Sequence, residues 1–181
     1  MQPIPNQPWT IKNLNYRVMD GPFGLMGIAS TERGVCNLRT QIRNESEYTA
    51  YLEKIYGMPP VNNGSELNNV TEELESYFRG EKVKFSSPLD LRFGTPFQQK
   101  VWKKLRTVPY GRTSSYQWLA EAINNPQACR AVGNANGKNP IPIIIPCHRI
   151  VASNGGLGGY TGGLTIKKFL LNLEQKLHAP L

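Results

Sequence analysis

The sequence predicts an α/β (α+β) protein in two parts: an N-terminal small β-sheet with helices and a linker over residues 1–93, and a mostly helical C-terminal domain over residues 94–181. Short apolar runs separated by turn residues fill residues 15–40, which is typical of strands. From Thr95 onward, apolar residues recur at helical spacing behind capping signals. A chain of 181 residues is long enough to bury a core in each part.

The N-terminal part begins with a predicted β-meander whose strands lie near residues 16–19, 25–29 and 35–38. A helix capped by Ser46 follows. A second, short helix runs to Gly80, and we expect residues 81–93 to form the linker.

The C-terminal part opens on a capping box, because Thr95 and Gln98 have the required spacing and proline occupies the first helical position. Two short helices follow, broken at residues 124–126, with the second starting near Gln127. Short helices across a tight turn predict a helix-turn-helix. The first helix has Phe97, Val101 and Leu105 on its inner face, and the last has Ile166, Phe169, Leu170, Leu173 and Leu177.

The formal charge of +8 indicates a polyanionic partner, and most of the excess lies in the C-terminal part. A solvated basic face would show the same pattern, so charge alone leaves nucleic-acid binding open. Against the single acid Glu121, the basic residues between Thr95 and Val151 are Lys100, Lys103, Lys104, Arg106, Arg112, Arg130, Lys138 and Arg149.

Apolar runs are too short for a membrane span, and the N-terminus lacks the features of a secretory signal. We therefore expect a cytoplasmic protein with no membrane partner. The cysteines Cys36, Cys129 and Cys147 are odd in number and widely spaced, and the chain has only two histidines. This pattern predicts reduced thiols and no metal site.

Cys147 and His148 follow a β-branched run, Ile143–Ile145, that predicts a buried strand ended by Pro146. A thiolate is a nucleophile, and an imidazole can take the thiol proton. However, cysteine commonly packs as a small hydrophobe, and neighbours on a strand point to opposite faces. Adjacency alone leaves both interpretations open.

The string Asn139–Ile150, NPIPIIIPCHRI, resembles the active-site signature of the O6-alkylguanine-DNA alkyltransferases. The likeness covers residues 94–174 in the family's order and spacing. It implies direct-reversal DNA repair without a cofactor, in which the alkyl group of O6-alkylguanine moves irreversibly to Cys147 in a single turnover. It also implies a ribonuclease-H-like layout for the N-terminal part. Whether O4-alkylthymine is also a substrate stays open.

The resemblance assigns the catalytic residues. Cys147 is the alkyl acceptor, His148 is linked to it through a water, and Glu174 steadies the imidazolium. Tyr116 donates to the guanine as its O6 leaves, and Asn139 stabilises the turn before the acceptor. Taken without the resemblance, Glu174 is interpreted as a surface charge and Tyr116 as a core residue.

Arg130 resembles the family's intercalating arginine, which fills the stack once the damaged nucleotide has rotated out. Small residues beside Arg130 would let the helix approach the narrow minor groove. The resemblance implies that the partner is double-stranded DNA bearing O6-alkylguanine and that the protein binds it as a monomer. The chain departs from the common pattern at Cys129, beside the DNA surface, and at Asn136, near the pocket. The other implied DNA-binding residues are Ala131, Gly133, Ser115, Thr95 and Arg112, and the implied substrate pocket comprises Pro142, Ile150, Tyr160, Thr161 and Gly162.

Three other functions compete with this one. A non-catalytic protein that recognises alkyl lesions would keep the DNA-binding fold but lack the acceptor cysteine, which is present here. A helix-turn-helix transcription factor would need longer polar side chains to contact bases in the major groove. A cysteine hydrolase would turn over repeatedly.

Overall fold

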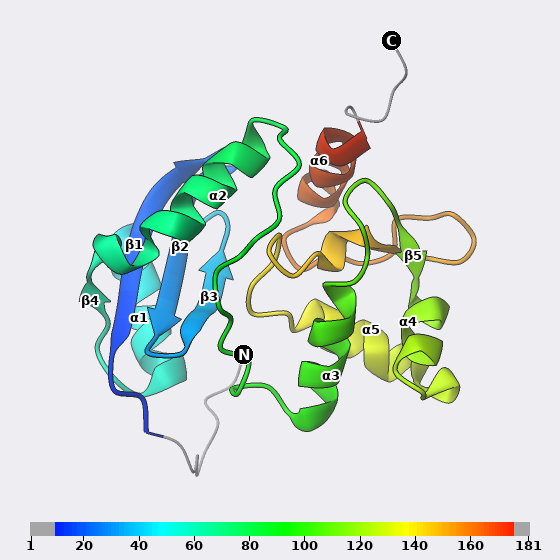
Figure 1. Ribbon diagram of the computed structural model, residues 1–181, viewed down its shortest axis with the longest axis horizontal. Coiled ribbons are helices and arrows are strands. Elements are labelled where there is room, and N and C mark those ends of the chain that lie inside the picture. Colours follow the sequence, from blue (N-terminus) through cyan, green and yellow to red (C-terminus); the bar gives the residue numbers. More distant parts are fainter. Residues whose placement is uncertain (1–9, 176–181) are drawn as a thin grey trace. The chain divides into compact units, whose positions relative to one another are not determined.

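The structure is a computed structural model that describes residues 10–175, and it divides the chain into two compact units (Figure 1). The N-terminal unit takes in residues up to Arg79 together with Val83–Phe93, and the C-terminal unit takes in Gly80–Lys82 and the residues from Gly94 onward. Within the described part of the chain, no helix is long and apolar enough to cross a membrane.

The N-terminal unit is built on a four-stranded sheet of order β3-β2-β1-β4. Strands β1 (Leu14–Gly21), β2 (Gly24–Thr31) and β3 (Gly34–Arg39) form the predicted antiparallel meander. The fourth strand, β4 (Val61–Asn62), pairs parallel to β1 and was missed. Two exposed residues are too short a segment for alternation to be visible in the sequence.

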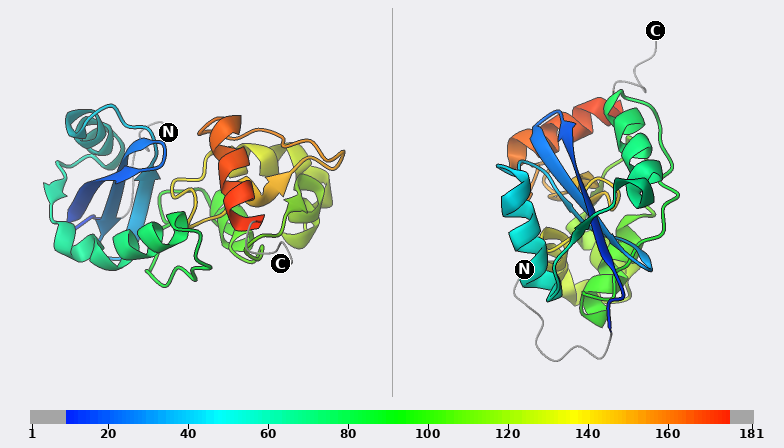
Figure 2. Two further views of the ribbon diagram at one scale, coloured as in Figure 1. Left: turned by 90° about the horizontal axis from the view of Figure 1, so that it is seen from above. Right: turned by 90° about the vertical axis from the view of Figure 1, so that its left-hand side faces the viewer.

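Two helices cover the sheet, α1 (Glu45–Tyr56) on one face and α2 (Asn68–Phe78) on the other, and the turn η1 (Gly64–Leu67) leads into α2 (Figure 2). The predicted cap of α1 is wrong. Asn44, and not Ser46, is the cap, since its side chain accepts a hydrogen bond from a backbone N–H of the first turn.

The expected linker contains no helix, but it packs along the sheet instead of hanging free. The Val35 N–H donates to the Pro88 carbonyl at 2.8 Å, and the Asp90 N–H donates to the Val35 carbonyl at the same distance. Leu91 and Phe93 are buried. Residues 83–93 therefore belong to the N-terminal unit.

In the C-terminal unit, α5 contacts both α3 and α4. Trp102 fixes the first of these contacts, because its Nε1 donates to the Ala135 carbonyl at 2.8 Å. The capping box of Thr95 and Gln98 is confirmed, whereas Phe97 is only half-buried and Trp102 takes its place on the inner face. The helices are α3 (Pro96–Leu105), α4 (Tyr116–Ala122), η2 (Pro126–Ala128), α5 (Cys129–Gly137) and α6 (Leu164–Gln175).

A small parallel ladder brings two distant segments of this unit together. Strand β5 (Ser114–Ser115) leads directly into α4, and β6 (Ile150–Val151) directly follows the turn η3 (Cys147–Arg149). Pairing of Ser114 with Ile150 places the start of α4 beside the candidate acceptor.

Candidate active site

Cys147 lies at the start of η3 and is 4% exposed. The Asn139 side chain and the Tyr160 hydroxyl both interact electrostatically with its thiol. Burial raises the pKa of this thiol to about 11, although Asn139, Lys167 and nearby backbone N–H groups act in the opposite direction. At neutral pH the thiol therefore keeps its proton and needs a base to become a nucleophile.

His148, the next residue in η3, is completely buried. Its Nε2 lies 2.8 Å from Oε1 of Glu174. Burial lowers the pKa of the imidazole, although Glu174 acts to raise it, so His148 is neutral at pH 7 and able to accept a proton. Burial acts to raise the pKa of Glu174, but hydrogen bonds from His148 and Arg149 lower it to about 2. An imidazole thus faces a permanent anion.

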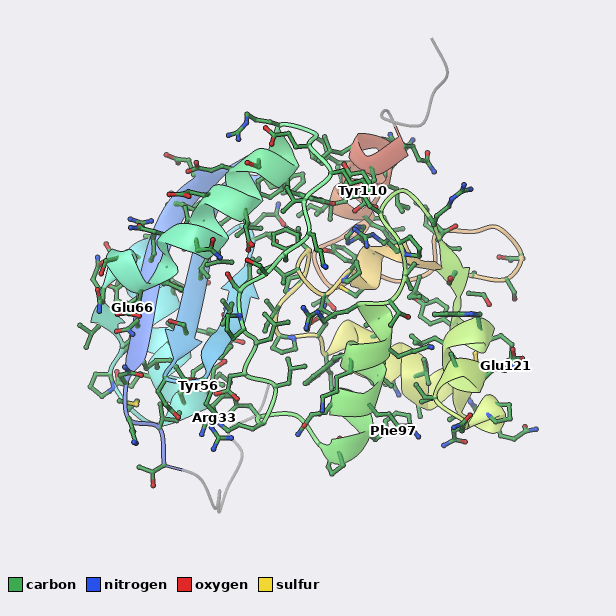
Figure 3. All side chains as sticks on the ribbon, viewed as in Figure 1. Arg33, Tyr56, Glu66, Phe97, Tyr110 and Glu121 are labelled. Carbon is green, nitrogen blue, oxygen red and sulfur yellow. The ribbon has the colours of Figure 1, made fainter. Side chains whose placement is uncertain are left out.

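Arg149, counted above only as part of the basic excess, completes this cluster inside the protein. It is 8% exposed and grips Glu174 with two hydrogen bonds of 2.9 Å. A third bond runs to the Val108 carbonyl at 2.7 Å, and the guanidinium lies over the ring of Tyr110, labelled beside α6 in Figure 3. The Gly111 N–H also donates to Glu174, at 3.0 Å. A cation inside a buried segment was the available signal, because such a charge needs a buried partner.

The expected strand at Ile143–Ile145 is also wrong, because these residues form a tight turn. Asn139 organises it: its Nδ2 donates to the Ile145 carbonyl at 2.8 Å, and its Oδ1 accepts from the Ile141 N–H at 3.0 Å. Prolines within the segment lack the N–H that a ladder needs. Ile143 has a φ of 74°, which strains a β-branched residue and marks a constrained site.

Tyr116 is the first residue of α4 and faces residues 155–163, the glycine-rich loop before α6. Its hydroxyl donates to the Gly159 carbonyl at 3.4 Å. Gly158, with a φ of 66°, permits this approach, since a Cβ there would lie 3.0 Å from the Tyr116 ring. The same loop is tied to α5, because the Thr161 hydroxyl donates to the Gly137 carbonyl at 2.6 Å.

Among the expected pocket residues, Tyr160 interacts electrostatically with the Cys147 thiol. The Ile150 N–H donates to the Cys147 carbonyl. Asn136, singled out as a departure from the common pattern, also reaches this carbonyl through Nδ2 at 3.4 Å and is 4% exposed. Pro142 and Gly162 are half-buried, and Thr161 is exposed.

The expected DNA-binding residues lie mostly at the surface of the same unit. Arg130 and Ala131 are exposed in the first turn of α5. Gly133 is half-buried, and Ser115 caps α4 through a hydrogen bond from the Trp118 N–H at 3.0 Å. Thr95, the cap of α3, and Arg112, in the turn before β5, are also exposed.

Lys167 was missed altogether. It is completely buried on α6, and its Nζ donates to carbonyls beside the thiol. Phe169, expected to face inward, is 38% exposed, while Lys167 and Leu171 are buried; Leu177 lies outside the described residues. A signal was present, because Lys167 precedes Glu174 by seven residues and so shares its helix face. Within residues 10–175, no cluster of three or more histidine, cysteine or acidic side chains could hold a metal ion.

Comparisons with known proteins agree across both units. A family model described as "6-O-methylguanine DNA methyltransferase, ribonuclease-like domain" matches residues 14–91, and one described as "6-O-methylguanine DNA methyltransferase, DNA binding domain" matches residues 96–176. Both halves of the predicted fold are thereby confirmed.

Curated relatives and solved structures match over nearly the whole chain. A methylated-DNA–protein-cysteine methyltransferase of Mycolicibacterium paratuberculosis is 43% identical, over 92% of this chain and 95% of the relative. The constitutive one of Bacillus subtilis is 39% identical, over 88% and 94%. The crystal structure of Mycobacterium tuberculosis OGT in complex with DNA is 41% identical, with a TM-score of 0.77, over 90% and 93%. The chain therefore belongs to the 6-O-methylguanine DNA methyltransferase family.

Proposed function

We propose that this DNA-repair methyltransferase moves the alkyl group of O6-alkylguanine in double-stranded DNA onto the sulfur of its own Cys147, once per chain. Its class, a methylated-DNA–protein-cysteine methyltransferase, follows from its family. The observation that supports the finer proposal is the buried cluster of His148, Glu174 and Arg149, two members of which follow the buried Cys147 in η3.

The chemistry requires the thiol to lose its proton as the sulfur attacks. We assign the proton to His148, relayed by a water between the two side chains, and the resulting imidazolium is stabilised by Glu174. Arg149 keeps that carboxylate ionised and in place. The sulfur forms a bond to the alkyl carbon, the bond from that carbon to O6 breaks, and its electron pair stays on the guanine.

The departing guanine gains negative charge and then takes up one proton. We assign to Tyr116 the hydrogen bond to the departing guanine; its hydroxyl is able to donate because burial raises its pKa and keeps it protonated at neutral pH. A donor aimed at developing charge lowers the barrier. The product is a thioether, from which no group in the cluster can regenerate the thiol, so the reaction ends after one event.

Access to the alkylated base requires its rotation out of the duplex. Arg130 is exposed at the beginning of α5, where the adjacent Ala131 leaves room for a close approach to the minor groove. Its side chain would fill the gap left in the stack. One chain carries all of these residues, so a monomer suffices.

The test is incubation of the protein with a duplex carrying labelled O6-methylguanine. We expect at most one label per chain, on Cys147 by peptide mass spectrometry, with unmodified guanine left in the DNA. Turnover beyond one equivalent would reject the single-use mechanism, and binding without labelling would indicate the non-catalytic lesion-binding alternative. A parallel duplex with O4-methylthymine determines whether this base is also a substrate.

A further inference from the structure

Lys167 is a buried cation that the chemistry above does not use. It is completely buried on α6, and its ammonium donates hydrogen bonds to three backbone carbonyls. The distances are 2.5 Å to Ile150 and 3.3 Å to Gly159, and the third acceptor is Leu157. Within residues 10–175, no carboxylate lies within salt-bridge distance of Nζ. Hydrogen bonds to backbone carbonyls therefore take the place of water and of a counter-ion around this charge.

The three carbonyls belong to two different parts of the site. Ile150 follows η3 directly and pairs with β5, whereas Leu157 and Gly159 belong to the glycine-rich loop that faces Tyr116. An ammonium has three N–H donors, and here each has an acceptor. A neutral amine would keep only two donors and turn a lone pair toward a carbonyl oxygen.

We propose that Lys167 is a positioning residue for the transfer reaction: its charged ammonium fastens the glycine-rich loop to the strand end beside Cys147, so that the substrate pocket is formed only while Lys167 carries its proton. This inference rests on the proposed function. Lys167 would act through the wall of the pocket, which the glycine-rich loop forms, because its hydrogen bonds go to backbone carbonyls.

The electrostatic surroundings make this proton removable. Burial lowers the pKa of Lys167 to about 8, although Cys147 acts to raise it. The titratable side chains that face it are Cys147 and His148, both on η3, and the charge of Lys167 acts to lower the pKa of each. Near Gly159 lie two tyrosines, Tyr116 and Tyr160, and burial raises the pKa of both hydroxyls.

The pH dependence of transfer separates this inference from simple thiol chemistry. With a thiol pKa of about 11, ionisation alone would make the rate climb between pH 7 and pH 10. If the pocket needs a charged Lys167, the rate should fall instead. At pH 9, one unit above a pKa of about 8, roughly a tenth of Lys167 is still charged. We expect the first-order transfer rate at saturating duplex to fall about tenfold from pH 7 to pH 9.

Substitutions identify the group responsible. Lys167→Met should transfer slowly at every pH and show no alkaline fall. Lys167→Arg keeps a cation with a pKa far above this range, so its rate at pH 9 should hold at its pH 7 value. The matched control is Lys168→Met, an exposed neighbour on the same helix, which should reproduce the native profile. Circular dichroism at each pH verifies that every variant is folded.

The outcomes are separable. Absence of transfer at every pH would reject the proposed function itself. Transfer whose rate rises steadily to pH 10 would reject the role of Lys167 and leave the function standing. An alkaline fall that persists in Lys167→Met would assign it to another group and also overturn the inference. If the arginine does not fit, the native and Lys167→Met profiles still decide.

Discussion

The two units each bury one thiol, and the two thiols differ in their neighbours more than in their burial. Cys36 on β3 is 1% exposed, and burial raises its pKa to about 12; Cys147 is 4% exposed, and burial raises its pKa to about 11. Cys36 lies 3.5 Å from the Ala29 carbonyl in a core that includes Tyr48. Its own carbonyl accepts from the Tyr56 hydroxyl, labelled in Figure 3.

Around Cys147 the neighbours are donors, a cation and a base. Asn139 and Lys167 act to lower its pKa, and His148 follows it directly in η3. Burial keeps both thiols protonated at neutral pH, so burial does not distinguish an inert cysteine from a reactive one. In the proposed mechanism, the two thiols differ because Cys147 has a neighbouring imidazole that can accept its proton and that is held by an anion.

The largest effect expected from this comparison is on the thiols themselves. Cys147→Ser should abolish transfer while keeping affinity for the alkylated duplex, because a serine hydroxyl is a far weaker nucleophile of similar size. Cys36→Ser should transfer at the native rate and lose only stability, since a hydroxyl replaces a buried thiol. Labelled-DNA transfer and thermal melting measure the two effects. Label on Cys36 or Cys129 would overturn the comparison.

The buried carboxylates form a second pair. Glu174→Gln should slow transfer roughly 10²-fold or more, because the imidazolium loses its counter-ion. Asp90 in the N-terminal unit is likewise buried, 2.8 Å from Arg92 and 2.6 Å from the Thr31 hydroxyl. Asp90→Asn should destabilise its unit without slowing transfer in the folded protein. Single-turnover rates at 25 °C measure both variants, with folding checked by circular dichroism. An equal loss of rate in the two variants would contradict the difference expected between the two carboxylates.

An exposed arginine in each unit tests base rotation. Arg130→Ala should slow transfer from duplex O6-methylguanine about tenfold to a hundredfold, since unstacking costs a few kcal/mol that the arginine partly offsets. Free O6-benzylguanine needs no rotation and should react at nearly the native rate. Arg33→Ala is the control in the N-terminal unit. Rates are compared at saturating DNA and one salt concentration; equal losses on duplex and free base would point to a structural role.

Glu174 should also affect stability in acid, and this effect is separate from the transfer step itself. The pKa of Glu174 is lowered to about 2 from 4.5, so its stabilisation is present above the unfolded value and disappears as pH falls through the folded one. Near neutral pH, Glu174→Gln should be about 3 kcal/mol less stable than the native protein. The gap should narrow as pH falls from 4.5 towards 2. Urea unfolding of both proteins across this range measures it, and a constant gap would contradict the assignment.

Local signals in the sequence predicted much of the fold. The meander, the capping box at Thr95 and the short helices around residues 124–126 depend on turn chemistry and periodicity within a few residues. The string around Cys147 identified the family by resemblance. Within that string, Asn139 appeared as the residue that organises the turn, because its bonds reach only neighbouring backbone.

Tertiary structure alone decided how charges are partnered and which residues face the site. Arg149 belonged to a basic surface by composition, yet it holds Glu174 across 25 residues of sequence. The sequence does not distinguish Lys167 from the other lysines; its place on α6 brings its ammonium to the carbonyls of Ile150 and Gly159. Composition determined that this chain is basic and carries a thiol beside an imidazole. A buried charge takes its role from partners brought together by folding, and sequence proximity does not record them.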